Sequence, residues 1–222
     1  MNLALFDLDH TLLPLDSDHA FGEFLVSHGW ADAEEHRRKN DVFYADYQAG
    51  RLDIAAYVDF ATSAWRERSE LEQEQLRSTF MADVIQPSLL EPALALVRRH
   101  RLQGDLLALV TATNEFVTAP IARALGFEHL VATRLERDGQ GHVTGRIHGV
   151  ANLREGKVHN VTAWLEHQGL GWGDFSTSTC YSDSTNDLPL LERVTHPIAT
   201  NPGADLERLA SARGWPILKL FA

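Results

Sequence analysis

Residues 3–13 read Leu-Ala-Leu-Phe-Asp-Leu-Asp-His-Thr-Leu-Leu, an apolar strand that ends in two aspartates. Because side chains alternate along an extended chain, Asp7 and Asp9 are expected on the same side of it. Two crowded carboxylates repel each other unless a cation or a shared proton relieves them. The first ten residues therefore predict a site built for chemistry rather than for packing alone.

From Pro87 onward the sequence alternates between strand and helix patterns. After a first strand at 3–8, further strands are expected at 105–111, 129–133, 179–182, 197–200 and 215–218. Helices are expected between them, at 93–100, 117–125, 158–165 and 206–213. Residues 133–150 hold Arg-Asp-Gly-Gln-Gly-His between extended segments, which indicates a hairpin. This alternation predicts an α/β fold, a three-layer Rossmann-like core with a parallel sheet covered on both faces.

The stretch from about residue 15 to residue 88 has a different character. Phe21, Phe24 and Leu25 share one helical face, and apolar residues from Ile54 to Trp65 recur at helical spacing. No convincing strand interrupts this stretch. We therefore expect a helical module inserted into the α/β domain.

Composition limits the function classes. The 222 residues suffice for one full core with a small second domain. A formal net charge of −11 argues against a nucleic-acid partner, because phosphate backbones need a basic face. The single cysteine, Cys180, fits a reducing compartment. No targeting or membrane-spanning pattern is visible, so we expect a cytoplasmic protein without a membrane partner. Nothing in the sequence indicates an oligomeric state.

The strongest polar signals follow predicted strands or open a helix. In a parallel sheet these groups converge on the carboxyl edge, where ligands bind. Three or four carboxylates would then share a pocket with a hydroxyl and a lysine. Oxygen ligands of this kind favour Mg²⁺, and no His/Cys cluster offers a zinc alternative. The converging residues are Asp7, Asp9, Thr111, Lys157, Asp183 and Asp187.

The order of these signals resembles the haloacid dehalogenase (HAD) superfamily. Its four motifs are matched by Asp-Leu-Asp-His-Thr at 7–11, Thr111, Lys157 and Ser-Asp-Ser-Thr-Asn-Asp at 182–187. The helical insertion resembles the C1-type cap of the phosphoserine-phosphatase-like branch, subfamily IB. The resemblance implies a catalytic core of residues 1–14 and 88–222 and a cap domain of residues 15–87.

The resemblance also implies a role for each motif residue. Asp7 would attack phosphorus and form an aspartyl-phosphate, and Asp9 would protonate the leaving alkoxide. Thr111 and Lys157 would hold the phosphoryl oxygens. Mg²⁺ would be bound by Asp7, the backbone carbonyl of Asp9 and Asp183, with Asp187 supporting them. Asn186 would reach the substrate, which is a small phosphorylated metabolite.

The sequence specifies the substrate less closely than it specifies the reaction. Asp16 occupies the place of the acidic residue that meets the substrate ammonium in phosphoserine phosphatases. An ungapped alignment puts Asp59 where those enzymes carry an arginine for the substrate carboxylate, although Arg51, Arg66 or Arg68 could substitute. Ala112-Thr113 also replaces their glycine pair, and Ser182 replaces a common glycine. With Asp16 and Asp59 as substrate-binding residues, a cationic amine without a carboxylate is expected, and L-histidinol phosphate fits better than phosphoserine.

Other function classes remain open to different degrees. A phosphoserine phosphatase, a phosphotransferase or a phosphomutase would use the same site residues. A haloacid dehalogenase has no need of the acid at Asp9, and a non-enzymatic relative would usually have lost one motif residue. A metal–nucleotide glycosyltransferase would leave Thr111 and Lys157 unexplained. The sequence favours a Mg²⁺-dependent phosphatase.

Overall fold

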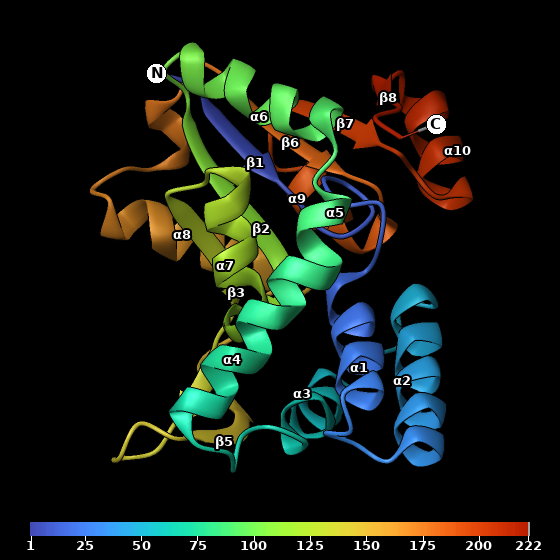
Figure 1. Ribbon diagram of the computed structural model, residues 1–222. Coiled ribbons are helices and arrows are strands. Elements are labelled where there is room, and N and C mark those ends of the chain that lie inside the picture. Colours follow the sequence, from blue (N-terminus) through green and yellow to red (C-terminus); the bar gives the residue numbers. More distant parts are fainter. Residues whose placement is uncertain (222) are drawn as a thin grey trace.

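The computed structural model, which describes residues 1–221, confirms the α/β class (Figure 1). Six parallel strands form one sheet in the order β3-β2-β1-β6-β7-β8. The predicted strands are all present, but the first ends at Phe6 instead of residue 8. They are β1 (Leu3–Phe6), β2 (Leu106–Asn114), β3 (His129–Thr133), β6 (Ser178–Ser182), β7 (His196–Thr200) and β8 (Ile217–Leu218).

Helices cover both faces of this sheet, as the buried central strand requires. Ala4 and Phe6 of β1 pack into one apolar cluster with α6 (Glu91–Leu102) and α7 (Glu115–Leu125). Leu3 and Leu5 point to the other face, where the helices are α8 (Glu155–His167), α9 (Leu188–Leu191) and α10 (Ala204–Arg213). Two-residue alternation along β1 thus divides the core into two layers.

The regular elements between β1 and α6 are all helical. They are α1 (Ser17–Ser27), α2 (Ala33–Gln48), α3 (Ile54–Ser63), α4 (Glu70–Phe80), a π-helical turn η1 (Met81–Ile85) and α5 (Gln86–Ser88). Asp16, Asp32 and Asp53 cap α1, α2 and α3 with their side chains, and Ser69 and Glu72 form a capping box for α4. Side-chain caps therefore fix where α1, α2, α3 and α4 begin.

The predicted hairpin is also present. Strands β4 (Leu135–Arg137) and β5 (Val143–Ile147) pair antiparallel, and β5 packs against α3. The hairpin thus extends from the α/β core onto the helical segment (Figure 1). Elsewhere in the core, two short 3₁₀ turns, η2 (Trp172–Asp174) and η3 (Thr185–Asp187), flank β6.

Strand order locates the ligand-binding edge. The chain moves from β1 to β2 on one side of the sheet and later crosses to β6 on the other side. The order therefore reverses between β1 and β6. In parallel α/β sheets, ligands bind beyond the carboxyl ends of the strands at such a reversal.

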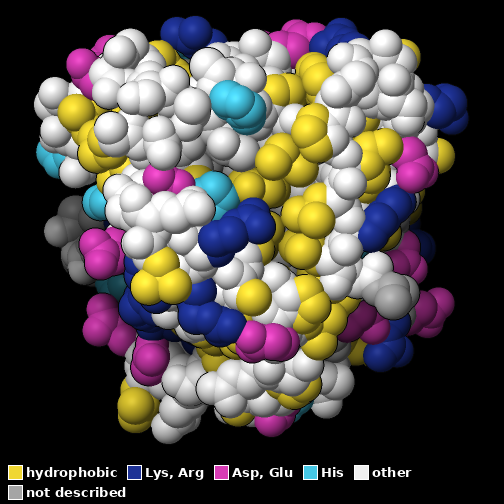
Figure 2. All heavy atoms as spheres, turned by 90° about the horizontal axis from the view of Figure 1, so that it is seen from above, with side chains coloured by type: hydrophobic (Ala, Val, Ile, Leu, Met, Phe, Trp, Pro, Cys, Tyr) yellow, Lys and Arg dark blue, Asp and Glu magenta, His cyan; other side chains and the backbone are white. Residues whose placement is uncertain are grey.

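The opposite end of the molecule is shown in Figure 2, which views the top of Figure 1 with α6 and β7. Hydrophobic side chains form a band there with charged side chains around it. Among the described residues, no single helix is long and apolar enough to cross a membrane. One pair, residues 70–88 and 91–102, meets that length and composition only when taken together, and the pair is bent by 92°.

Trp65 connects the helical segment to the α/β core. Its side chain is 1% exposed and stacks on Phe116 of α7 with ring centroids 3.8 Å apart. We expect Trp65→Ala to lower the free energy of unfolding by about 3–5 kcal/mol, because it leaves a cavity at this junction. Urea denaturation measures the loss, with Leu71→Ala, at a 68% exposed position of α4, as the control. Equal losses in the two variants would contradict this packing role.

Candidate active site

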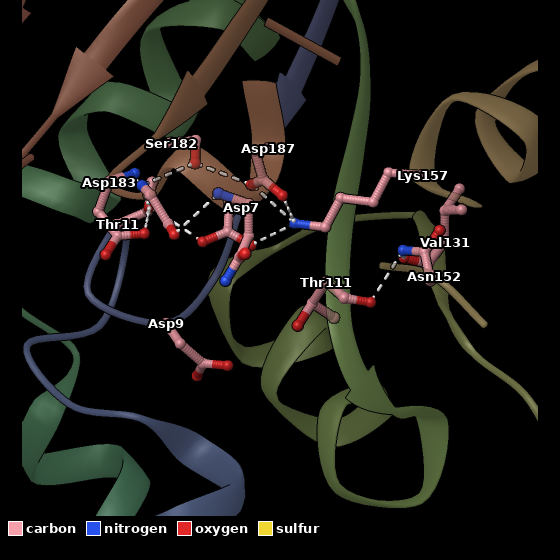
Figure 3. Close-up of polar contacts among 12 residues, drawn as sticks. Asp7, Asp9, Thr11, Thr111, Val131, Asn152, Lys157, Ser182, Asp183 and Asp187 are labelled. Atoms are coloured by element: carbon pink, nitrogen blue, oxygen red, sulfur yellow. Dashed lines mark hydrogen bonds and ion pairs between the residues drawn. The ribbon is translucent and has the colours of Figure 1, made fainter. Parts of the chain in front are cut away.

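Lys157 lies at the centre of a buried ion-pair network. Its ammonium donates to Asp7 Oδ1 at 2.8 Å and to Asp187 Oδ2 at 2.7 Å, and its side chain is 1% exposed. Burial disfavours the lysine charge, but the two carboxylates outweigh it and raise the pKa of Lys157 above its ordinary value. Ser182 donates a further hydrogen bond to Asp187 at 2.8 Å. Lys157 is therefore charged and holds β1, α8 and η3 together (Figure 3).

Asp183 lies on the other side of Asp7. The Thr11 hydroxyl donates to Asp7 Oδ2 at 3.1 Å, and it accepts the backbone N–H of Asp183 at the same distance. Burial, and then the charge of Asp7, raise the pKa of Asp183 well above its ordinary value. Asp183 forms no ion pair among the described residues. This part of the site thus holds a third carboxyl group, that of Asp183, which pairs with no cation among the described residues.

Asp9 does not face the same way as Asp7, contrary to expectation. The regular alternation ends with β1 at Phe6, and the Asp9 carboxylate points away from the lysine network (Figure 3). Its Oδ1 accepts the backbone N–H of Ser17 at 2.7 Å, and its Oδ2 accepts the Thr113 hydroxyl at 3.0 Å. Burial, followed by the charge of Asp16, raises the pKa of Asp9 to about 7. The two aspartates therefore differ in environment, although burial raises the pKa of both.

Thr111 is fully buried and lies inside β2, three residues before that strand ends at Asn114. The Asn152 side-chain amide donates at 2.8 Å to the carbonyls of both Thr111 and Val131. Asn152 is itself fully buried and thus ties β2 to β3 beside the site (Figure 3). Sequence reasoning missed this residue, because its partners lie 41 and 21 positions away.

A pocket opens between Asp9 and the helical segment. Its wall carries the carboxylates of Asp9, Asp16 and Asp18 and no lysine or arginine. Sequence reasoning found Asp16 but missed Asp18, which lies two residues further along α1. The other lining residues are mostly aromatic or apolar, and they are His19, Asn40, Phe43, Tyr44, Tyr47, Leu52, Ile54, Tyr57, Ala112 and Thr113.

Two further sequence-predicted residues lie outside this pocket. Asn186 is buried, and its amide donates to the backbone carbonyl of Tyr47 at 3.1 Å, which joins η3 to the end of α2. Asp59 is exposed and forms an ion pair with Arg66 at 2.6 Å, near the β4–β5 hairpin. The structure therefore brings together Asp7, Asp9, Asp16, Thr111, Lys157, Asp183 and Asp187, and it does not bring Asp59 to them.

The arrangement is competent for phosphoryl chemistry. A buried carboxylate, Asp7, has a fixed ammonium at its side, and Asp9, two residues further along the chain, carries a carboxyl group with a pKa raised to about 7. Positioned charge and a proton donor are what phosphoryl transfer requires.

Comparisons with known proteins agree with this chemistry. The model of the haloacid dehalogenase-like hydrolase family matches residues 4–192. A histidinol-phosphatase of Neisseria meningitidis is 40% identical over 217 residues, which cover 98% of each protein. A phosphoserine phosphatase of Mycobacterium tuberculosis, SerB1, is 32% identical and is matched over 96% of this chain and 69% of its own length.

Solved structures share the whole fold. A Bordetella pertussis protein of unknown function superposes with a TM-score of 0.94 at 52% identity, covering 99% of both chains. A phosphoserine phosphatase with bound substrate has a TM-score of 0.68 at 16% identity, covering 97% of this chain and 91% of its own. That second likeness concerns the fold alone. From the family match and these relatives, the chain belongs to the haloacid dehalogenase-like hydrolases and is a phosphatase, a phosphoric monoester hydrolase, of that family.

Proposed function

We propose that this phosphatase is Mg²⁺-dependent, forms an aspartyl-phosphate on Asp7, and hydrolyses an amino-alcohol phosphate such as L-histidinol phosphate. The observation that carries the substrate is the pocket beside Asp9, whose lining has three carboxylates and no lysine or arginine. The name of the Neisseria relative, histidinol-phosphatase, supports the same substrate.

Asp7 is the nucleophile in this proposal. One of its oxygens attacks phosphorus while the ester oxygen leaves, which gives a covalent phosphoryl-aspartate that water then hydrolyses. The Lys157 ammonium, 2.8 Å from Oδ1, offsets the charge that gathers where two anions meet. Thr111, whose backbone carbonyl accepts a hydrogen bond from Asn152, supplies a hydroxyl to a phosphoryl oxygen.

Asp9 is the proton donor to the leaving alkoxide. Its pKa of about 7 keeps a substantial fraction protonated near neutral pH. Its position between the lysine network and the pocket supports this role, because the ester oxygen lies between phosphate and amine. After the alkoxide leaves, the ionised Asp9 takes a proton from the attacking water.

The residues around Asp7 fit a bound Mg²⁺. Asp7 and Asp183 offer carboxylate oxygens on either side of Thr11, and Asp9 offers its backbone carbonyl. Mg²⁺ usually takes one or two carboxylates and keeps several waters. The described residues hold no cluster of three or more His, Cys, Asp or Glu side chains around one point, which agrees with so small a ligand set. Asp187 supports these metal ligands indirectly, because it holds Lys157, which also contacts Asp7. A bound Mg²⁺ would offset part of the negative charge of the phosphoryl group.

Phosphoserine is the leading alternative substrate, and the relative SerB1 bears its name. Its carboxylate would need a cation in the pocket. Each candidate arginine instead contacts another acidic side chain outside the lining: Arg51 pairs with Asp46, Arg66 with Asp59 and Arg68 with Glu72. A phosphotransferase or phosphomutase would use the same residues and differ only in the acceptor.

We further propose a cytoplasmic location, since the lone Cys180 is a buried free thiol.

A substrate panel tests the choice of substrate. We expect kcat/KM for L-histidinol phosphate to exceed that for phosphoserine by about tenfold or more, because the pocket aspartates repel a carboxylate, and each factor of ten needs about 1.4 kcal/mol. A phosphate-release assay with and without Mg²⁺ measures both values. Faster turnover of phosphoserine, or full activity after chelation, would contradict the proposal.

Asp7→Asn tests the nucleophile. We expect turnover to fall below detection while the fold is retained, because Lys157 keeps Asp187 as a partner. Thermal melting followed by circular dichroism checks the fold. The control is Asp83→Asn, which removes the same charge at an exposed position of η1. Activity of Asp7→Asn equal to that of the control would refute the assignment.

The pH profile tests Asp9. A carboxyl group with a raised pKa is protonated below that value and loses its proton as the pH rises through it. Hydrolysis of alkyl phosphates should therefore decline as the pH rises through about 7. Hydrolysis of p-nitrophenyl phosphate should decline less, because its leaving group needs little protonation. Parallel kcat/KM profiles for the two substrates would argue against an acid role.

A further inference from the structure

Two carboxylates in the pocket have no cationic partner. Asp7 and Asp187 share Lys157, whereas neither Asp16 nor Asp18 forms an ion pair with any described residue. Asp18 is only 9% exposed. Buried carboxylates without a counter-charge are costly, and they are normally paired. The pocket wall therefore holds more carboxyl groups than one substrate ammonium would pair with.

The two carboxylates differ in what they already bind. Asp16 Oδ1 caps α1 by accepting the backbone N–H groups of Asp18 and His19, which leaves Oδ2 for a ligand. Burial raises the pKa of Asp18 to about 8, and hydrogen bonding to the Tyr57 hydroxyl of α3 opposes this rise. Burial raises the pKa of Tyr57 well above its ordinary value, so this hydroxyl keeps its proton and remains a donor. Tyr57 thus fixes the direction of the Asp18 carboxylate.

A second, independent observation also points to a polar ligand in this pocket. His19 lines it with a side chain that is 28% exposed. Its Nε2 atom lies 3.9 Å from Asp41 Oδ1, and its Nδ1 atom is buried without a hydrogen-bond partner among the described residues. Native structures leave few such atoms unsatisfied. The His19 ring also lies 4.8 Å, centroid to centroid, from the ring of Tyr44. This wall therefore combines aromatic rings with an unmet polar atom, which suits a flat nitrogen-containing ring.

We propose that Asp18, held by Tyr57, determines specificity by binding a second nitrogen-bearing group of the substrate, beyond the ammonium that Asp16 binds. In L-histidinol phosphate that second group is the imidazole ring. The amine of an amino-alcohol phosphate is close to the ester oxygen and therefore meets the nearer carboxylate. This inference rests on the proposed substrate class and adds a requirement for two nitrogen-bearing groups.

Steady-state kinetics on three phosphates test the role of Asp18. L-histidinol phosphate has both groups, 2-aminoethyl phosphate has only the ammonium, and p-nitrophenyl phosphate has neither. We expect Asp18→Asn to raise KM for L-histidinol phosphate by about 10- to 100-fold, the usual worth of a hydrogen bond to a charged group, with kcat nearly unchanged. KM for the other two substrates should stay within about twofold, which also shows that the variant folds.

Tyr57→Phe provides a milder second variant, and Asp83→Asn provides the charge-matched control. Tyr57→Phe should raise KM in the same direction by a smaller factor, because the carboxylate remains but loses its fixed direction. Equal losses on all three substrates would reveal a merely structural residue and overturn the proposal. An unchanged KM for L-histidinol phosphate would overturn it as well.

Calorimetric titration with L-histidinol separates this inference from the proposed function. Failure of the wild type to hydrolyse L-histidinol phosphate would contradict the proposed function, and the titration would still decide on Asp18. We expect Asp18→Asn to weaken L-histidinol binding by about 10- to 100-fold and to leave 2-aminoethanol binding unchanged. Equal L-histidinol binding by both proteins, or none by the wild type, would overturn the inference.

Discussion

The rest of the site depends on one buried ammonium between two carboxylates. Lys157 comes from α8, Asp7 follows β1 and Asp187 ends η3, so a single cation joins three parts of the chain that lie far apart in sequence. Loss of a buried partner leaves a charge in a medium that cannot solvate it, which costs several kcal/mol. The network therefore fixes Asp7, the proposed nucleophile, and the supporting loops together, before any substrate arrives.

The position of this ammonium gives the site a charge gradient. Near Lys157, a phosphate dianion can be tolerated, whereas the far wall of the pocket carries Asp16 and Asp18 without a counter-charge. Asp9 lies between these two ends, with hydrogen bonds to Ser17 and Thr113. A substrate with an anionic head and a cationic tail matches this gradient in one orientation only. Orientation, more than contact area, then places the ester oxygen beside Asp9.

The strand-end rule explains how much of the fold and the site could be predicted. Six parallel strands end at one edge, so Asp7, Thr111 and Asp183 had to converge once the strands were identified. The rule failed where regular structure stops: β1 ends at Phe6, and the turn after it points Asp9 away from Asp7. Asp59 stayed outside the pocket for a related reason, since alignment along a helix does not tell which side of the helix faces the site.

Two kinds of side chain test sequence reasoning: those that act through distant partners and those that perform two tasks. Asn152 has no local signal, because its amide holds two carbonyls of different strands. Asp16 shows the second case: sequence reasoning assigned it to the substrate, and it also caps α1, as an aspartate before a helix commonly does. Capping uses one carboxylate oxygen, however, and leaves the other facing the pocket. A local structural explanation therefore does not exclude a functional one, and at the start of α1 the cap is what aims the carboxylate.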